Sequence, residues 1–131
     1  MEYMKNISNL IKVTEFRLKL YPRNFDTTRD FYENFLGFKP TEEWNNDDLD
    51  KGVMFDVGGT ILELVSGKAD EKVYAGYVSL EVPDVLKLWE ELKTYPKIAQ
   101  GLRNNDWGDT SFSIYDPEGF WITFFTKTNI E

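Results

Sequence analysis

The chain has 131 residues, of which 41% are hydrophobic and 16% aromatic, enough to form the core of one globular domain. It contains no cysteine and no histidine, so disulfides, thiolate nucleophiles and histidine-ligated metal centres are excluded for the chain by itself. The net charge of −8 argues against partners such as nucleic acid or an anionic membrane, and it would favour a cationic ligand, although such a charge is ordinary among soluble proteins.

The amino-terminal residues have the spacing of a short amphipathic helix, with Met4, Ile7, Leu10 and Ile11 on one side. No stretch here or later is as long and apolar as a signal peptide or a membrane-spanning helix. We therefore expect a soluble protein of the cytoplasm.

From Val13 the hydrophobic period changes to two, which predicts a strand. Its predicted core face carries Phe16, Leu18 and Leu20. The opposite face, which includes Arg17, must border either solvent or a polar cleft.

A helix is expected next, with Asp26 as its N-cap and its end near Leu36, where Gly37 suits a C-terminal cap. Residues 38–44 would form a second strand, and Pro40 places that strand at the edge of a sheet.

An acidic run follows at residues 45–50. It has some likeness to a calcium loop but lacks the glycine and the bidentate glutamate that such a loop needs, so a solvated turn is expected. Residues 53–57 and 60–65 then predict a hairpin around a glycine turn.

The second half of the chain repeats this order after a linker at residues 66–72. A strand over 73–82 is followed by a helix beginning at Pro83 and Asp84. A weak strand at 98–102 and a polar loop at 103–109 come next. The last hairpin turns at Asp116-Pro-Glu-Gly119.

An offset of sixty residues relates the two halves. It aligns Gly59 with Gly119, Glu63 with Thr123, and residues 17–20 with residues 77–80. Two well-separated strand segments rarely share one spacing by chance. We therefore expect a single domain over residues 1–131 made of two β-α-β-β-β units, about 13–66 and 73–126.

Five segments together resemble the vicinal-oxygen-chelate superfamily, which includes glyoxalase I, bleomycin-resistance proteins and extradiol dioxygenases. These segments are residues 26–38, 58–64, 82–84, 107–108 and 116–122. The resemblance spans roughly residues 13–126. It implies an α+β fold in which two tandem βαβββ units form a curled mixed sheet around a cleft, with the helices outside, and a homodimer.

The resemblance also assigns the family's metal-ligand positions to Arg17, Glu63, Tyr77 and Thr123. Of these, only Glu63 could bind a hard divalent ion, because arginine stays protonated and a phenol or threonine is a poor ligand. We therefore expect no metal and no other cofactor. Our hypothesis is that Arg17 and Glu63 form an ion pair in place of the metal. The alternative interpretation is a buried polar pair without a ligand.

Period two predicts the walls of the cleft. The expected cleft-facing residues are Ile61, Glu63, Val65, Tyr77, Ser79, Glu81, Trp121, Thr123 and Phe125. Leu62, Leu64, Val78, Leu80, Ile122 and Phe124 should face the helices. The candidate ligand-binding residues are Arg17, Glu63, Tyr77, Trp107, Trp121 and Thr123. The family resemblance implies that Trp107 lies on a loop near the mouth of the cleft.

Two classes of function fit this pattern. The first is a metal-independent protein that binds a small aromatic or cationic molecule, like the bleomycin-resistance members that confer antibiotic resistance. The second is an enzyme, either a lyase, transferase or dioxygenase with an unusual metal site or a metal-free catalyst with Glu63 as base and Arg17 as electrostatic stabiliser. A third interpretation, a vestigial cleft in an assembly subunit, predicts that Trp121 and Tyr77 are packed solid.

Overall fold

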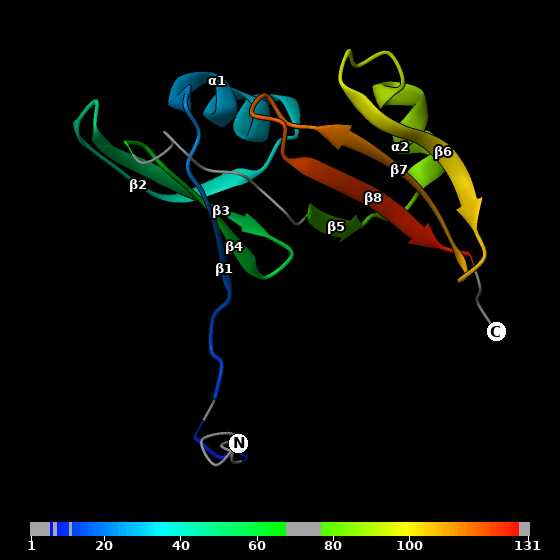
Figure 1. The fold of residues 1–131 in the computed structure, drawn as a ribbon, viewed down its shortest axis with the longest axis horizontal. Coiled ribbons are helices and arrows are strands. Elements are labelled where there is room, and N and C mark those ends of the chain that lie inside the picture. The colour runs from blue at the N-terminus through cyan, green and yellow to red at the C-terminus, as the bar shows by residue number, and fades with distance from the viewer. Residues whose placement is uncertain (1–5, 7, 11, 68–76, 129–131) are drawn as a thin grey trace.

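The computed structural model describes residues 6, 8–10, 12–67 and 77–128 and has eight strands and few helices (Figure 1). In chain order the elements are β1 (Arg17–Leu20), α1 (Phe25–Asp30), the π-helical segment η1 (Phe31–Phe35), β2 (Lys39–Asp47), β3 (Asp50–Val57), β4 (Thr60–Val65), β5 (Tyr77–Glu81), α2 (Val85–Leu92), β6 (Ile98–Asn105), β7 (Asp109–Tyr115) and β8 (Trp121–Lys127). The expected α+β class is confirmed.

The strands form two four-stranded sheets of the same topology, β1-β4-β3-β2 and β5-β8-β7-β6. In each sheet the first strand pairs in parallel with the fourth, and the other pairs are antiparallel. The register also repeats, because Lys19 pairs with Glu63 in the first sheet and Ser79 pairs with Thr123 in the second. The sixty-residue offset read from the sequence is therefore an offset between equivalent positions of two βαβββ units.

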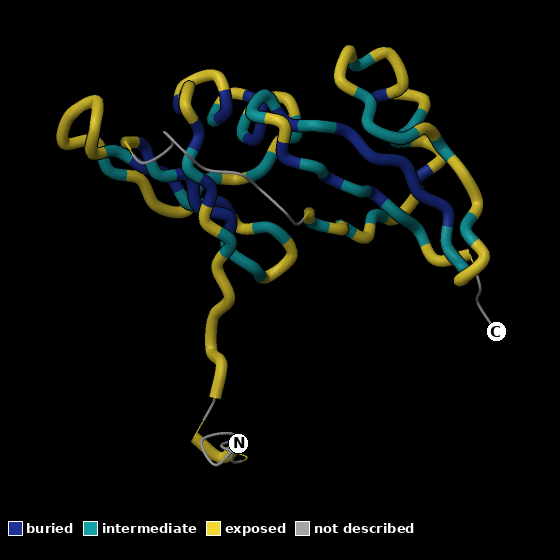
Figure 2. The backbone as a smooth tube through the Cα atoms, viewed as in Figure 1, coloured by how far each residue is buried: buried dark blue, intermediate teal, exposed yellow. Residues whose placement is uncertain are grey.

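The apolar residues of β4 and β8 that were predicted to face the helices are buried, and the central strand β7 is buried along most of its length (Figure 2). Leu64 and Ile122 are 0% and 1% exposed, and Leu62 and Phe124 are also buried. Phe16 is an exception to the predicted core face, because it is 64% exposed. It lies one residue before β1 begins, where the sheet no longer covers it.

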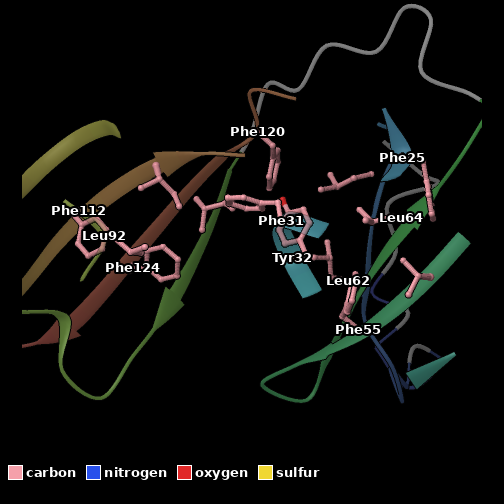
Figure 3. Packing of buried hydrophobic residues seen from close by; sticks show 14 of the residues in the cluster. Phe25, Phe31, Tyr32, Phe55, Leu62, Leu64, Leu92, Phe112, Phe120 and Phe124 are labelled. Carbon is pink, nitrogen blue, oxygen red and sulfur yellow. The ribbon is translucent and has the colours of Figure 1, made fainter. Parts of the chain in front are cut away.

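The two units meet through the helical segment of the first one. Figure 3 shows Phe31, Tyr32 and Phe120 between the aromatic and aliphatic side chains of the two sheets. The rings of Phe31 and Phe35 lie 5.9 and 5.4 Å from the ring of Tyr95 in the second unit. The core is therefore continuous across both units, while the sheets themselves stand side by side (Figure 1).

The first helix differs from the prediction at its start. Its N-cap is Asn24, whose side chain accepts a hydrogen bond from the backbone N–H of Thr27, and Asp26 lies within the first turn. Both residue types are good caps, so the sequence offered two candidates. The helix then widens into η1, where the N–H of Leu36 reaches the carbonyl of Phe31.

Two predicted loops are shorter in the structure. The acidic run is solvated, as expected, but β2 continues to Asp47 and β3 begins at Asp50, so this run is the tip of a hairpin. The expected loop at 103–109 is mostly strand, because β6 continues to Asn105 and β7 begins at Asp109. The edge strands β2 and β6 thus include polar residues that their low strand propensity had assigned to loops.

Several expectations concern residues outside the described part. These are the helix through Met4, Ile7 and Ile11, most of the linker, and the strand before Tyr77. Within the described ranges, no helix is long and apolar enough to span a membrane. The cytoplasmic location stays a prediction.

Candidate functional site

Four of the six candidate residues line one groove on the open face of the second sheet. These are Tyr77, Trp107, Trp121 and Thr123, and the groove encloses about 570 Å³. Its other lining residues are Ser79, Gln100, Arg103, Asp109, Ser111 and Phe125. Period-two reasoning therefore placed Trp121, Thr123 and their neighbours on the correct side of the sheet, opposite the buried face.

Aromatic rings form the walls of this groove. The ring of Trp121 lies 5.9 Å from that of Tyr77 and 5.6 Å from that of Tyr115. Its indole N–H donates to Oγ1 of Thr123 at 2.9 Å, which fixes the ring's orientation. Tyr77 is 64% exposed and Trp107 is 71% exposed. In the single chain the Tyr77 and Trp107 rings are open to a ligand, while Trp121 is half-buried against Tyr77 and Tyr115. The solid packing that a vestigial cleft predicts for both Trp121 and Tyr77 is therefore not seen at Tyr77.

Hydrogen bonds between side chains hold the polar end of the groove in place. Oδ2 of Asp109 accepts from the indole N–H of Trp107 at 3.0 Å, and its Oδ1 accepts from Nδ2 of Asn105 at 2.7 Å. The same amide nitrogen donates to Oγ of Ser111 at 2.8 Å. The loop tryptophan is therefore anchored through its nitrogen while its ring stays exposed.

Arg103 is a groove residue that the sequence analysis did not identify. It was assigned to a polar loop, whereas in the structure it lies on β6. A break in the β6–β7 register falls between Gln100 and Arg103, which pair with Ser113 and Ser111 respectively. The irregularity lets two residues three positions apart face the same groove. Strict alternation along the sequence cannot find such a pair.

Arg17 and Glu63 are brought together, but on the first sheet and outside this groove. Nη1 of Arg17 lies 3.7 Å from Oε1 of Glu63, and Nζ of Lys19 lies 3.8 Å from the same oxygen. The Glu63 side chain is 5% exposed, whereas those of Arg17 and Lys19 are 39% and 50% exposed. The expected ion pair is therefore present, with a second cation that the sequence analysis did not include.

The charge on Arg17 is secured by a second carboxylate. Nε of Arg17 donates to Glu15, and this hydrogen bond raises the pKa of the guanidinium further above its ordinary value. Oε1 of Glu63 accepts no hydrogen bond from the described residues, although it is buried. The interaction at Glu63 is thus mainly electrostatic, between one buried anion and two cations at the surface.

The four positions that the family resemblance assigns to metal ligands do not fit a divalent ion. Arg17 and Glu63 lie on the first sheet, while Tyr77 and Thr123 lie on the second. Two cations already stand against the Glu63 carboxylate, and Oγ1 of Thr123 is engaged by Trp121 and by Oγ of Ser113. Among the described residues, no three acidic side chains gather as a metal site would need.

The chain matches a known protein family over most of its length. The sequence model of the glyoxalase/bleomycin resistance protein/dioxygenase superfamily matches residues 14–124. A comparison with curated proteins finds no match. The family match includes both units and therefore both groups of candidate residues.

Solved structures show the same fold at low sequence identity. A lactoylglutathione lyase from Agrobacterium tumefaciens is similar with a TM-score of 0.68 and 18% identity, over 88% of this chain and 95% of that one. TioX from Micromonospora sp. ML1 gives a TM-score of 0.70 and 20% identity, over 88% and 99% of the two chains. A glyoxalase/bleomycin resistance protein/dioxygenase from Alicyclobacillus acidocaldarius gives a TM-score of 0.66 and 21% identity, over 88% of this chain and 92% of that one.

Proposed function

The chain belongs to the glyoxalase/bleomycin resistance protein/dioxygenase superfamily, and we propose that it binds a small aromatic molecule without a metal, in the groove of the second sheet. The observation that carries this proposal is the set of rings that line the groove, namely the exposed rings of Tyr77 and Trp107 and the half-buried ring of Trp121. Rings of this kind stack on a planar ligand, and the polar side chains between them orient it. Sequestration confers resistance when the bound molecule is an antibiotic.

Binding is favoured over catalysis by the state of the carboxylates. Asp109 is the one carboxylate that lines the groove among the described residues, and both of its oxygens accept hydrogen bonds. Glu63 is the candidate base of the enzyme alternative. It lies on the first sheet outside the groove, with Arg17 and Lys19 at 3.7 and 3.8 Å from its carboxylate, so it does not reach a ligand bound in the groove of the same chain.

We further propose that the protein acts as a homodimer. In one chain, the groove is lined by the second sheet alone, and Arg17 and Glu63 lie on the first sheet. A second copy that sets its first sheet opposite the groove would bring this ion pair to the bound ligand. The exposed rings of Tyr77 and Trp107 at the groove give such an interface apolar contacts.

Calorimetric titration with a panel of aromatic compounds tests the binding proposal. We expect saturable binding by one class of compound and at least a roughly tenfold weaker affinity after Trp121→Ala, because ring stacking is lost. Phe35→Ala is the control, since the Phe35 ring packs against Tyr95 on the helical side of the fold, outside the groove. Equal loss in both variants, or no saturable binding at all, would reject the proposal.

A further inference from the structure

The groove carries one charge of each sign, whereas the chain as a whole is acidic. The groove contains one guanidinium, that of Arg103, and one carboxylate, that of Asp109, among its lining residues. The chain carries 23 acidic and 15 basic residues. Whether a bound ligand interacts with the Arg103 guanidinium or with the Asp109 carboxylate depends on the hydrogen bonds that each group already makes.

Arg103 is free to bind an anion. Among the described residues it takes part in no ion pair. In the orientation of the Gln100 amide that satisfies both groups, the Gln100 oxygen accepts from Nη1 at 2.9 Å and from Nη2 at 3.1 Å. A guanidinium has five N–H donors, so this neutral contact leaves its charge uncompensated and several donors unused.

Asp109, in contrast, has both of its oxygens hydrogen-bonded by neighbouring side chains of the groove. Its two oxygens accept from Asn105 and from the indole N–H of Trp107. A cationic ligand that bound this carboxylate would have to share its oxygens with these two donors, which hold the loop tryptophan in place. The groove therefore presents a guanidinium with several unused donors and a carboxylate whose two oxygens each already accept a hydrogen bond.

We infer that the groove selects an aromatic molecule bearing a carboxylate, with Arg103 holding the carboxylate and the rings of Trp121 and Tyr77 holding the aromatic part. This inference rests on the proposed function and adds the charge of the ligand. A planar guanidinium can bind a carboxylate through two parallel N–H donors, which a neutral amide or an amine does not match.

The net charge of −8 does not oppose this preference at contact distance. At physiological ionic strength the screening length is about 8 Å, so exposed acidic groups beyond the groove contribute little to a bound carboxylate. Glu81 lies on β5 two residues beyond Ser79, but it lines an adjoining hollow rather than the groove. The acidic surface slows the approach of an anion more than it weakens the bound state.

Three probes of matched shape test the inference by calorimetry. They are 1-naphthylacetate, 1-naphthylacetamide and 1-naphthylmethylammonium, which carry a negative, zero and positive charge on the same ring system. We expect the carboxylate to bind about tenfold more tightly than the amide, a difference typical of one charge-assisted contact. The ammonium should bind more weakly than both.

Arg103→Gln should remove the preference for the carboxylate and leave the affinity for the amide unchanged. Arg103→Lys keeps the positive charge but lacks the two parallel N–H donors of a guanidinium, so it should retain part of the preference for the carboxylate. The control is Arg23→Gln, the same change of charge at an exposed residue before α1 and outside the groove. It should leave all three affinities as they are.

The results separate this inference from the proposed function. Equal binding of the three probes, or a preference that survives Arg103→Gln, would overturn the inference and leave an aromatic-binding groove in place. Tightest binding of the ammonium would overturn it in favour of a cationic ligand. Saturable binding of none of the probes would overturn both the inference and the proposed function.

Discussion

The hydroxyl group of Tyr32 donates a hydrogen bond to Oδ2 of Asp116 at 2.7 Å and so joins the helical segment of the first unit to the last turn of the second. Both residues are almost fully buried, at 2% and 1% exposure. Oδ1 of Asp116 accepts from the backbone N–H groups of Glu118 and Phe120. One carboxylate thus shapes the Asp116-Pro-Glu-Gly119 turn and holds it against the neighbouring unit.

Removing that hydroxyl should destabilise the fold. Tyr32→Phe leaves a buried carboxylate oxygen without this donor, and we expect the free energy of unfolding to fall by about 1–3 kcal/mol. Denaturant titration measures this change. Tyr77→Phe is the control, because the Tyr77 side chain is exposed. An unchanged midpoint for Tyr32→Phe would show that the contact between the units does not depend on this bond.

The stability of the protein should also depend on pH through Asp116. Burial raises the pKa of this carboxyl, and the three donors that favour its ionised form only partly offset that effect. The folded state therefore binds the proton more tightly than the unfolded state. The resulting contribution to stability is complete below the ordinary pKa of about 4 and is lost as pH rises through the folded value.

Asp116→Asn isolates this contribution. As pH rises from about 4, the unfolding free energy of the original protein should fall relative to that of Asp116→Asn. Denaturant titrations at a series of pH values measure it. A shift in the opposite direction would mean that the hydrogen bonds to the carboxylate outweigh its burial.

The two cations beside Glu63 should substitute for each other. Arg17→Met and Lys19→Met should each change stability only slightly, because one cation remains within 4 Å of the buried carboxylate. The double variant leaves that carboxylate without a cation, and an uncompensated buried charge costs about 3 kcal/mol. Adding Glu63→Gln to the double variant should recover much of the loss. Additive effects of the single substitutions would contradict this account.

The protein should not hold a divalent metal ion at the positions that the family resemblance assigns to metal ligands. Only Glu63 among them is a suitable ligand, and Arg17 and Lys19 repel a dication from it. Native mass spectrometry of the purified protein should show the mass of the bare chain, and added zinc, nickel or magnesium should leave its melting temperature unchanged. One tightly held ion per chain would restore the enzyme alternative.

Local patterns in the sequence were sufficient to predict the units and the faces of their strands. Leu64 and Ile122 are buried, while Trp121 and Thr123 line the groove, because alternation holds wherever a strand is paired without interruption. Phe16 broke the rule at the end of a strand, and Arg103 broke it at an irregularity of register. Neither feature has a local signal in the residues themselves.

The hydrophobic periodicity of the sequence did not predict how the two units are arranged. The family resemblance implied one cleft shared by Arg17, Glu63, Tyr77 and Trp121. In the single chain these residues lie on two sheets and line no common groove. That outcome depends on how Phe31 and Phe35 pack against Tyr95, a contact between residues about sixty positions apart in the chain. Periodicity does not encode contacts of this range.

The most direct test of the central claim is a proton–nitrogen correlation spectrum recorded while 1-naphthylacetate is added to the protein. We predict saturable shifts for the backbone amides of Ser79, Ser111 and Thr123 and for the indole N–H groups of Trp107 and Trp121, which line the groove. Shifts absent from this groove, or shifts that do not saturate, would contradict the claim that the second sheet binds an aromatic ligand.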